Sequence, residues 1–149
     1  MGMKIGLISD IHGNRVALEA VLEAMPDVDE LCCAGDVVGY NPWPADCVDM
    51  LRERDIPTVM GNHDAAVAAE TSFRFNGMAQ AGVEHAEKQL SDDQLEWLAE
   101  LPTERHVDDG RLKLVHGHPD DPDRYTRYTY LQEFTPRLLG DEDVLVLGH

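Results

Sequence analysis

The segment KIGLISDIHGN, which runs from Lys4 to Asn14, is an apolar stretch that ends in polar residues of metal-binding types. Its apolar half is typical of a strand buried on both faces, and we predict a strand over residues 3–9. Apolar residues at helical spacing follow over residues 15–25, with Asn14 as the expected N-cap. A buried strand, a polar loop and an amphipathic helix in this order favour an α/β fold.

Apolar segments and turn residues continue to alternate along the chain. We predict further strands over residues 31–34, 58–60, 103–107, 111–116 and 144–147, and further helices over residues 45–54, 78–90 and 131–139. Ser91 and Gln94 have the spacing of a capping box, so another helix should begin there. Asp108-Asp109-Gly110 predicts a tight hairpin turn, which makes part of the sheet antiparallel. Residues 1–149 are therefore expected to form one α/β domain.

The charge composition restricts the function. The 149 residues include 12 Lys and Arg against 29 Asp and Glu, a formal net charge of −17. Such a surface does not neutralise a phosphate backbone, so we expect no non-specific binding to nucleic acid. We expect a cytoplasmic protein without membrane association, because no apolar run approaches the roughly 20 residues of a membrane helix and no signal-peptide layout is present. The acidity also suggests a halophilic adaptation, since high salt would screen the self-repulsion.

The three cysteines indicate neither a disulfide framework nor a zinc ribbon. Cys32 and Cys33 are adjacent, Cys47 stands alone, and none belongs to a C-x-x-C pair. We therefore expect buried, reduced thiols.

Each predicted strand ends in residue types that bind metal ions. The carboxyl ends of strands in an open α/β sheet face a common crevice, so loops far apart in sequence can converge there. The candidate residues are Asp10, His12, Asp36, Asn62, His63, Asp64, His116, His118 and His149. Carboxylate and amide oxygens mixed with imidazole nitrogens suit Mn²⁺, Fe²⁺ or Zn²⁺. Asp36, alone on its loop, is the natural bridge between two ions about 3.5–4 Å apart, a spacing suited to phosphoryl displacement.

Each of these signals also has a structural interpretation. An Asp-x-His or a Gly-Asp turn can be an ordinary turn, and Gly61-Asn62-His63-Asp64 could be a helix start with Asn62 or Asp64 as its cap. The order and strand-end placement of all the elements together favour a shared site.

The sequence resembles the calcineurin-like metallophosphoesterases, whose pattern is D-x-H, G-D-x-x-G, G-N-H-[DE], a lone His and G-H-x-H. The matching residues are Asp10/His12, Gly35/Asp36/Gly39, Gly61/Asn62/His63/Asp64, His116 and Gly148/His149. The resemblance extends from residue 3 to the end of the chain and is closest to the small bacterial and archaeal phosphodiesterase branch. It implies a four-layer α/β/β/α sandwich, in which two mixed sheets are faced by helices.

The resemblance also implies a centre of two divalent metal ions, with Mn²⁺ expected and Fe²⁺, Zn²⁺, Ni²⁺ or Co²⁺ as alternatives. The implied ligands of one ion are Asp10, His12 and Asp36, and those of the other are Asp36 as bridge, Asn62, His116 and His149. A hydroxide held between the ions would attack phosphorus. His63 would protonate the leaving oxygen as general acid, with Asp64 as its candidate orienting partner. The implied function is metal-dependent hydrolysis of a phosphodiester or phosphomonoester.

Two departures from the family pattern bear on this function. Protein Ser/Thr phosphatases have a second acidic residue and an Arg where this sequence has Gly39 and Tyr40, which argues against protein dephosphorylation. The G-H-x-H motif requires a second His two residues beyond His149, where this sequence ends. We therefore expect a domain truncated at its C-terminus, with the vacant ligand position filled by water or a neighbouring chain.

Substrate contacts are expected beside the metal centre. The candidate substrate-binding residues are Asn14, Arg15 and His118, whose alternative roles are a helix cap, a solvated Arg and an exposed loop His. Tyr40 lies on the loop after Asp36, where an aromatic ring could stack on a base or aryl group. Trp43 is expected to pack under the following helix, and His85 and His106 are expected to be structural.

The expected partner is a small phosphorylated or nucleotide-type substrate, because the net charge would repel polyanions outside the site. The Arg- and Tyr-rich segment over residues 124–130 could be a substrate lid, a contact of a homo-oligomer or an ordinary loop. The alternative function is a non-enzymatic scaffold, since the retromer subunit of this fold serves as a binding surface, but His63 favours the enzyme. A Rossmann-type regulator is disfavoured because no G-x-G-x-x-G follows the first strand.

Overall fold

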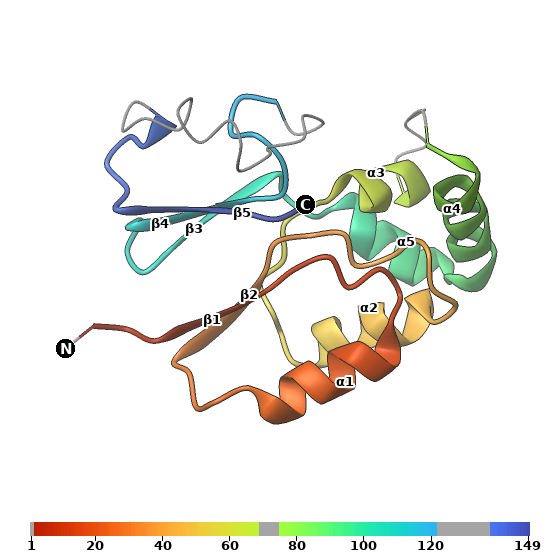
Figure 1. Ribbon diagram of the computed structural model, residues 1–149, viewed down its shortest axis with the longest axis horizontal. Helices are drawn as coiled ribbons and strands as arrows, with labels where there is room; N and C mark the ends of the chain where they lie inside the picture. Colours follow the sequence, from red (N-terminus) through yellow and green to blue (C-terminus); the bar gives the residue numbers. More distant parts are fainter. Residues whose placement is uncertain (1, 69–74, 122–137) are drawn as a thin grey trace.

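The computed structural model describes residues 2–68, 75–121 and 138–149 (Figure 1). Its helices and strands are β1 (Ile5–Ile8), α1 (Arg15–Ala24), β2 (Glu30–Cys33), α2 (Pro44–Glu53), α3 (Asn62–Ala68), α4 (Gly77–Gln89), α5 (Asp92–Ala99), β3 (Glu104–Val107), β4 (Leu112–Val115) and β5 (Val144–Leu147). The predicted alternation of strands and helices is confirmed over these ranges, and the fold is α/β.

The described strands form two sheets. β1 and β2 pair in parallel, with Ile5 opposite Glu30. β3 and β4 form the antiparallel hairpin predicted from the Asp108-Asp109-Gly110 turn, and β5 pairs with β4 in parallel, so the order in the second sheet is β3-β4-β5. Two mixed sheets were predicted; in the described part of the chain the second sheet is mixed, whereas the pairing in the first sheet is parallel.

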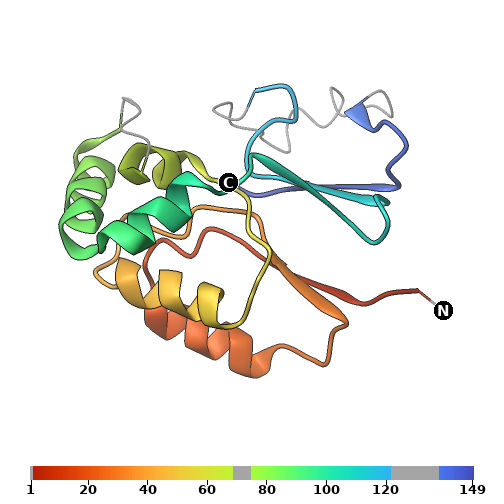
Figure 2. The same ribbon diagram turned by 180° about the vertical axis from the view of Figure 1, so that it is seen from behind.

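The layers are visible in both views. α1 and α2 lie on one side of β1 and β2, and the second sheet lies on the other side (Figures 1 and 2). One apolar core, which includes Leu18 and Leu51, fills the space between the helices and the first sheet. A second core, which includes Cys32 and Leu114, lies between the two sheets. The helix predicted over residues 131–139 falls almost entirely outside the described residues.

The strand predicted over residues 58–60 is reduced to a single bridge. Thr58 pairs with Cys33 in parallel, and the N–H of Val59 donates to the carbonyl of Cys33 at 3.0 Å. The next N–H, that of Met60, donates instead to the carbonyl of Pro102 at 2.8 Å. The prediction of a full strand is wrong because tertiary contact draws Met60 away from the sheet.

Caps that were predicted from sequence fix the helix starts. The side chain of Asn14 accepts the N–H of Ala17 at 3.0 Å, and both hydrogen bonds of the capping box between Ser91 and Gln94 are present. α3 begins at Asn62, so the Gly-Asn-His-Asp segment is a helix start. α3, α4 and α5 cluster beyond the carboxyl ends of β1 and β2 (Figure 1).

Several other predictions have structural outcomes. All three cysteines are buried and none forms a disulfide, as expected. Nε2 of His85 lies 3.1 Å from the carbonyl of Pro42, and Nε2 of His106 lies 2.8 Å from the carboxylate of Glu142, which fits their expected structural roles. Within the described part of the chain, no helix combines the length and the apolar character needed to cross a bilayer.

Candidate metal centre

Two loops after β1 and β2 lie side by side and form the base of the site. The N–H of Asp10 donates to the carbonyl of Gly35, and the N–H of His12 donates to that of Asp36, both at 2.9 Å. Asp10, His12 and Asp36 have φ angles of 54°, 49° and 54°. Residues other than glycine seldom adopt this left-handed backbone conformation, and such strain is concentrated at functional sites. The sharp turns place polar residues at the points where the strands end.

Asp36 lies at the centre of the site and is only 1% exposed. Its Oδ1 accepts the backbone N–H of His63 at 2.9 Å. Its Oδ2 lies 3.6 Å from Nε2 of His12 and 3.2 Å from Nε2 of His116. Nε2 of His12 is also 3.6 Å from a carboxylate oxygen of Asp10. Asp36 therefore faces two sets of candidate ligands at once, as a bridging residue would.

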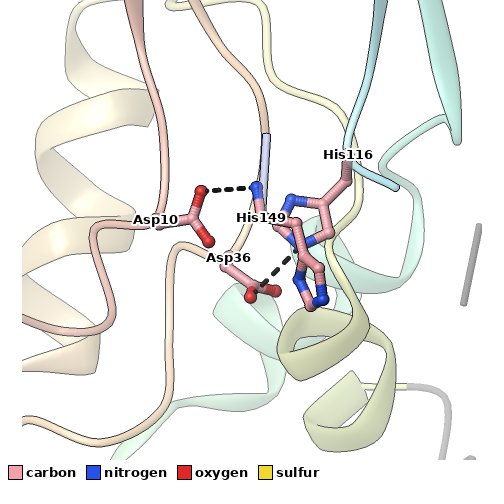
Figure 3. A group of neighbouring side chains, drawn as sticks. All are labelled: Asp10, Asp36, His116 and His149. Atoms are coloured by element: carbon pink, nitrogen blue, oxygen red, sulfur yellow. Dashed lines mark hydrogen bonds and ion pairs between the residues drawn. The ribbon is translucent and has the colours of Figure 1, made fainter. Parts of the chain in front are cut away.

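Asp10, Asp36, His116 and His149 come from separate segments and converge (Figure 3). One ligand-type atom from each lies within 4.8 Å of those from the others. The backbone N–H of His149 donates to Asp10 at 2.8 Å, and Nδ1 of His149 lies 3.0 Å from Nε2 of His116. Oδ1 of Asn62 lies 3.1 Å from the same Nε2 atom. The structure thus brings together all six predicted ligands, including His12.

The surroundings of His116 favour a positive charge. Its Nδ1 lies 2.7 Å from the carbonyl of Ala34, which can only accept, so Nδ1 carries a proton. In the neutral ring, Nε2 then presents a lone pair to two oxygens, those of Asp36 and Asn62. Burial lowers the pKa of His116, but the hydrogen bond and charge of Asp36 outweigh it and raise the pKa to about 9. A proton or a metal ion at Nε2 would satisfy both oxygens, and carboxylate, amide and imidazole donors fit a divalent metal ion.

Asp10 is held in its ionised form. Partial burial raises its pKa, but hydrogen bonds from His12, from the hydroxyl of Ser9 and from the backbone of His149 outweigh this and lower the pKa to about 2. The sequence analysis missed Ser9, because a serine at a strand end has no signature that separates it from an ordinary turn residue.

His63 lies beside the site and is 4% exposed. Its ring packs against the rings of His12, Tyr40 and Phe75, with centroid distances of 4.8, 4.9 and 4.6 Å. A Cβ atom at Gly39 would lie 2.5 Å from Nδ1 of His63, so the glycine makes room for the ring. Burial lowers the pKa of His63, and neighbouring imidazoles lower it further against the charge of Asp36. Phe75 was not predicted, because nothing in its sequence surroundings marks a contact with the site.

The expected contact between Asp64 and the His63 ring is wrong. Oδ1 of Asp64 accepts the N–H groups of Val37 and Val38 at 2.8 and 3.1 Å, and Oδ2 accepts the N–H of Gly61 at 2.9 Å. Among the described residues, no atom hydrogen-bonds Nδ1 of His63. Asp64 is a positioning residue instead, because it ties the loop that carries Asp36 to the start of α3.

The predicted substrate-binding residues have different surroundings. A cavity of about 400 Å³ is lined by Asn14 together with Asp10, His12 and Tyr40. The guanidinium of Arg15 lies 3.4 Å from Asp46 and 5.6 Å from the centre of the Trp43 ring. His118 is buried, and its Nδ1 accepts the N–H of Asp120 at 3.1 Å, which stabilises its own turn. Asn14 therefore lies at the site, whereas substrate contacts by Arg15 and His118 stay predictions.

The Arg- and Tyr-rich segment, residues 124–130, lies outside the described residues. Its predicted roles as a lid or as a contact between subunits stay predictions.

Comparisons with known proteins found similar sequences and structures. The sequence profile described as calcineurin-like phosphoesterase matches residues 3–149. The crystal structure of a metallophosphoesterase from Sphaerobacter thermophilus has a TM-score of 0.81 at 35% identity, over 100% of this chain and 61% of that one. An uncharacterized protein of Methanocaldococcus jannaschii is 29% identical over 150 residues, which cover 97% of this chain and 61% of the relative. A symmetrical bis(5'-nucleosyl)-tetraphosphatase of Salmonella paratyphi A is 28% identical over 116 residues, which cover 74% of this chain and 41% of the relative.

This chain therefore spans less than two thirds of the length of these relatives. The similarity to the Sphaerobacter structure confirms the predicted α/β fold with two sheets.

Proposed function

We propose that this chain, which belongs to the calcineurin-like phosphoesterase family, hydrolyses phosphate esters of small nucleotide-type molecules with the help of two divalent metal ions. The observation that carries the proposal is the convergence of the predicted ligands around Asp36. Imidazoles and carboxylates gathered at this spacing supply the donor types that divalent cations bind, which supports the proposal.

The family resemblance implies two ligand sets that share Asp36, and the short distances around Asp36 support them. The set proposed for one ion is Asp10, His12 and Asp36, and the set proposed for the other is Asp36, Asn62, His116 and His149. Two divalent ions bound there would neutralise phosphate oxygens and lower the pKa of a water molecule placed between them. Mn²⁺ is the proposed metal, because it accepts this mixture of oxygen and nitrogen donors.

His63 is the proposed general acid. Its ring adjoins His12, and its backbone N–H is hydrogen-bonded to Asp36, so α3 begins at a fixed position beside the site. Imidazole exchanges protons near neutral pH, so His63 can carry the proton that the leaving oxygen needs. Transfer of that proton to the leaving oxygen avoids the release of an alkoxide. The imidazole becomes neutral in this step and takes a proton from solvent before the next turnover.

Two observations support the substrate class. The name of the Salmonella relative specifies a bis(5'-nucleosyl) compound, which supports a small nucleotide-type substrate. The net charge of −17 opposes the approach of polyanionic polymers to the rest of the surface. The assay must distinguish phosphodiesters from phosphomonoesters, because the proposed centre suits both.

The test begins with metal-stripped protein. Release of p-nitrophenol from bis-p-nitrophenyl phosphate and from p-nitrophenyl phosphate would be followed with and without Mn²⁺, and bound metal would be counted after dialysis. We expect saturable turnover only when Mn²⁺ is added, and we expect two bound ions per chain. Asp36→Asn should lose both the turnover and the bound ions. His63→Asn should keep the metal and lower kcat by roughly 10²- to 10⁴-fold, the usual contribution of a general acid.

His106→Asn is the matched control, because His106 is a surface histidine paired with Glu142. It should leave both metal content and turnover unchanged. A chain that binds two Mn²⁺ ions but hydrolyses neither ester would overturn the proposal in favour of a non-enzymatic scaffold. Full turnover by His63→Asn would refute the acid role alone.

A further inference from the structure

We infer that the ring of Tyr40 is a stacking surface for a planar aromatic group, a nucleobase or an aryl ring, on the leaving side of the substrate. This inference rests on the proposed function, because it uses the position of His63 to locate the leaving group. It names a specificity-determining residue and a class of substrate.

The position of Tyr40 beside the proposed acid is the first argument. Its ring centroid lies 4.9 Å from those of both His12 and His63, with interplanar angles of 84° and 38°. A leaving oxygen that receives a proton from His63 must lie within hydrogen-bond reach of that ring. The group attached to this oxygen then extends over the neighbouring ring of Tyr40, a residue that is 43% exposed.

A groove continues from Tyr40 away from the metal centre. Its volume is about 500 Å³, and its walls include Tyr40, Met78, Ala81 and His85. A hydrogen bond between Nε2 of His85 and the carbonyl of Pro42 fixes one wall. Met78 is 74% exposed, and its flexible thioether can adapt to the edge or face of an aromatic ligand. The groove is large enough for an aromatic ring system and presents apolar contacts to it.

The backbone at Tyr40 is the second, independent argument. Its φ angle is 57°, a left-handed conformation that glycine or asparagine adopts at lower free energy than a bulky aromatic residue. Gly82 of α4 packs so closely that a Cβ atom there would collide with the backbone of Tyr40. The strained conformation is therefore imposed by packing, and burial of Tyr40 offsets only part of the strain, because the residue is 43% exposed. Strain that is retained in this way is typical of residues that contact ligands.

The test compares two ligands that share an anionic phosphorus centre. Binding of phenyl methylphosphonate and ethyl methylphosphonate to the Mn²⁺-loaded chain would be measured by calorimetry. We expect the phenyl compound to bind about tenfold more tightly, within the range observed for stacking on aromatic side chains. Tyr40→Phe should keep this preference. Tyr40→Asn should abolish it and should fold at least as stably as wild type, because asparagine tolerates the left-handed backbone.

Kinetics separate stacking from support of His63. With bis-p-nitrophenyl phosphate, Tyr40→Asn should raise KM by about tenfold with little change in kcat, in line with the loss of stacking. If the Tyr40 ring merely supported His63, its removal in Tyr40→Asn would instead lower kcat and leave the ratio of the two phosphonate affinities unchanged. Trp43→Leu is the control, because Trp43 is an exposed aromatic residue of the same loop that does not line the groove.

Equal affinity of the wild-type chain for the two phosphonates would overturn the inference, as would a phenyl preference that survives in Tyr40→Asn. A phenyl preference that depends on Tyr40, in a chain without turnover, would support the aromatic subsite and refute the proposed hydrolysis. The two proposals can therefore fail separately.

Discussion

Replacement of Asp64 by asparagine should destabilise the fold and weaken metal binding, although Asp64 is not a proposed ligand. Its carboxylate is fully buried and accepts three backbone N–H groups, those of Val37, Val38 and Gly61. Two of these donors belong to the loop that carries Asp36, and the third immediately precedes α3. The substitution preserves the shape of the side chain and changes one acceptor atom into a donor.

The magnitude follows from these contacts. If the amide oxygen of the introduced asparagine replaces Oδ1, the two N–H groups of Val37 and Val38 keep a weaker, uncharged acceptor. The amide nitrogen then takes the place of Oδ2, about 2.9 Å from the backbone nitrogen of Gly61. Both groups are donors, so the buried N–H of Gly61 is left without an acceptor. An unsatisfied buried polar group costs about 1–3 kcal/mol, and each weakened bond adds about 0.5 kcal/mol, so we expect a loss of about 3 kcal/mol. Relief of repulsion from Asp36, which together with burial raises the pKa of Asp64, offsets part of this loss.

The assay is urea unfolding of the metal-stripped chain, followed by tryptophan fluorescence and circular dichroism, together with Mn²⁺ titration. Asp109→Asn is the matched control, because Asp109 is exposed in the hairpin turn and its φ angle of 54° suits asparagine. The control should change the free energy of unfolding by less than about 0.5 kcal/mol. A loss below about 1 kcal/mol in Asp64→Asn, with unchanged Mn²⁺ affinity, would refute the positioning role.

Three further predictions concern other parts of the molecule. Ellman's reagent should modify none of the thiols of the native chain and all three after denaturation, because burial raises the pKa of Cys32 to about 11 and those of Cys33 and Cys47 to about 12; rapid native reaction would contradict this. The hydrogen bond from His106 lowers the pKa of Glu142 below 4.5, so stability from this pair is present above that value and is lost as pH falls through the lowered pKa. An NMR titration in which His106→Asn leaves the Glu142 pKa unchanged would contradict it. The free energy of unfolding should rise from low to multimolar salt because of the net charge of −17, and a flat salt profile would exclude the halophilic hypothesis.

The positions of the candidate ligands could be predicted because they depend on local sequence. An apolar run followed by Asp10 or Asp36 specifies a strand and the residue at its end, and the topology of an α/β sheet brings such ends together. The capping box at Ser91 is equally local and is confirmed in full. Features that depend on the nearest few residues survive tertiary packing in this chain.

The features that could not be predicted depend on distant partners. The strand over residues 58–60 is lost because Met60 donates to Pro102, a contact that no local pattern encodes. Asp64 has the same sequence signature whether its carboxylate faces the imidazole of His63 or the N–H groups of two loops. Its actual partners follow from the close packing of those loops around Gly61, where a Cβ atom would collide with Asp36.

The backbone of the site carries strain that hydrogen bonds elsewhere in the fold must offset. Four of the proposed ligands, Asp10, His12, Asp36 and His149, have positive φ angles, and a cation relieves none of this strain. A cation does relieve the repulsion between the buried charge of Asp36 and the ionised Asp10. Hydrogen bonds such as those of Asp64 must therefore hold the loops in this unfavourable backbone conformation. Metal binding would add stability by mass action, about 2.7 kcal/mol at a concentration of one hundred Kd. Variants that loosen these supports should consequently lose metal affinity before they lose the fold.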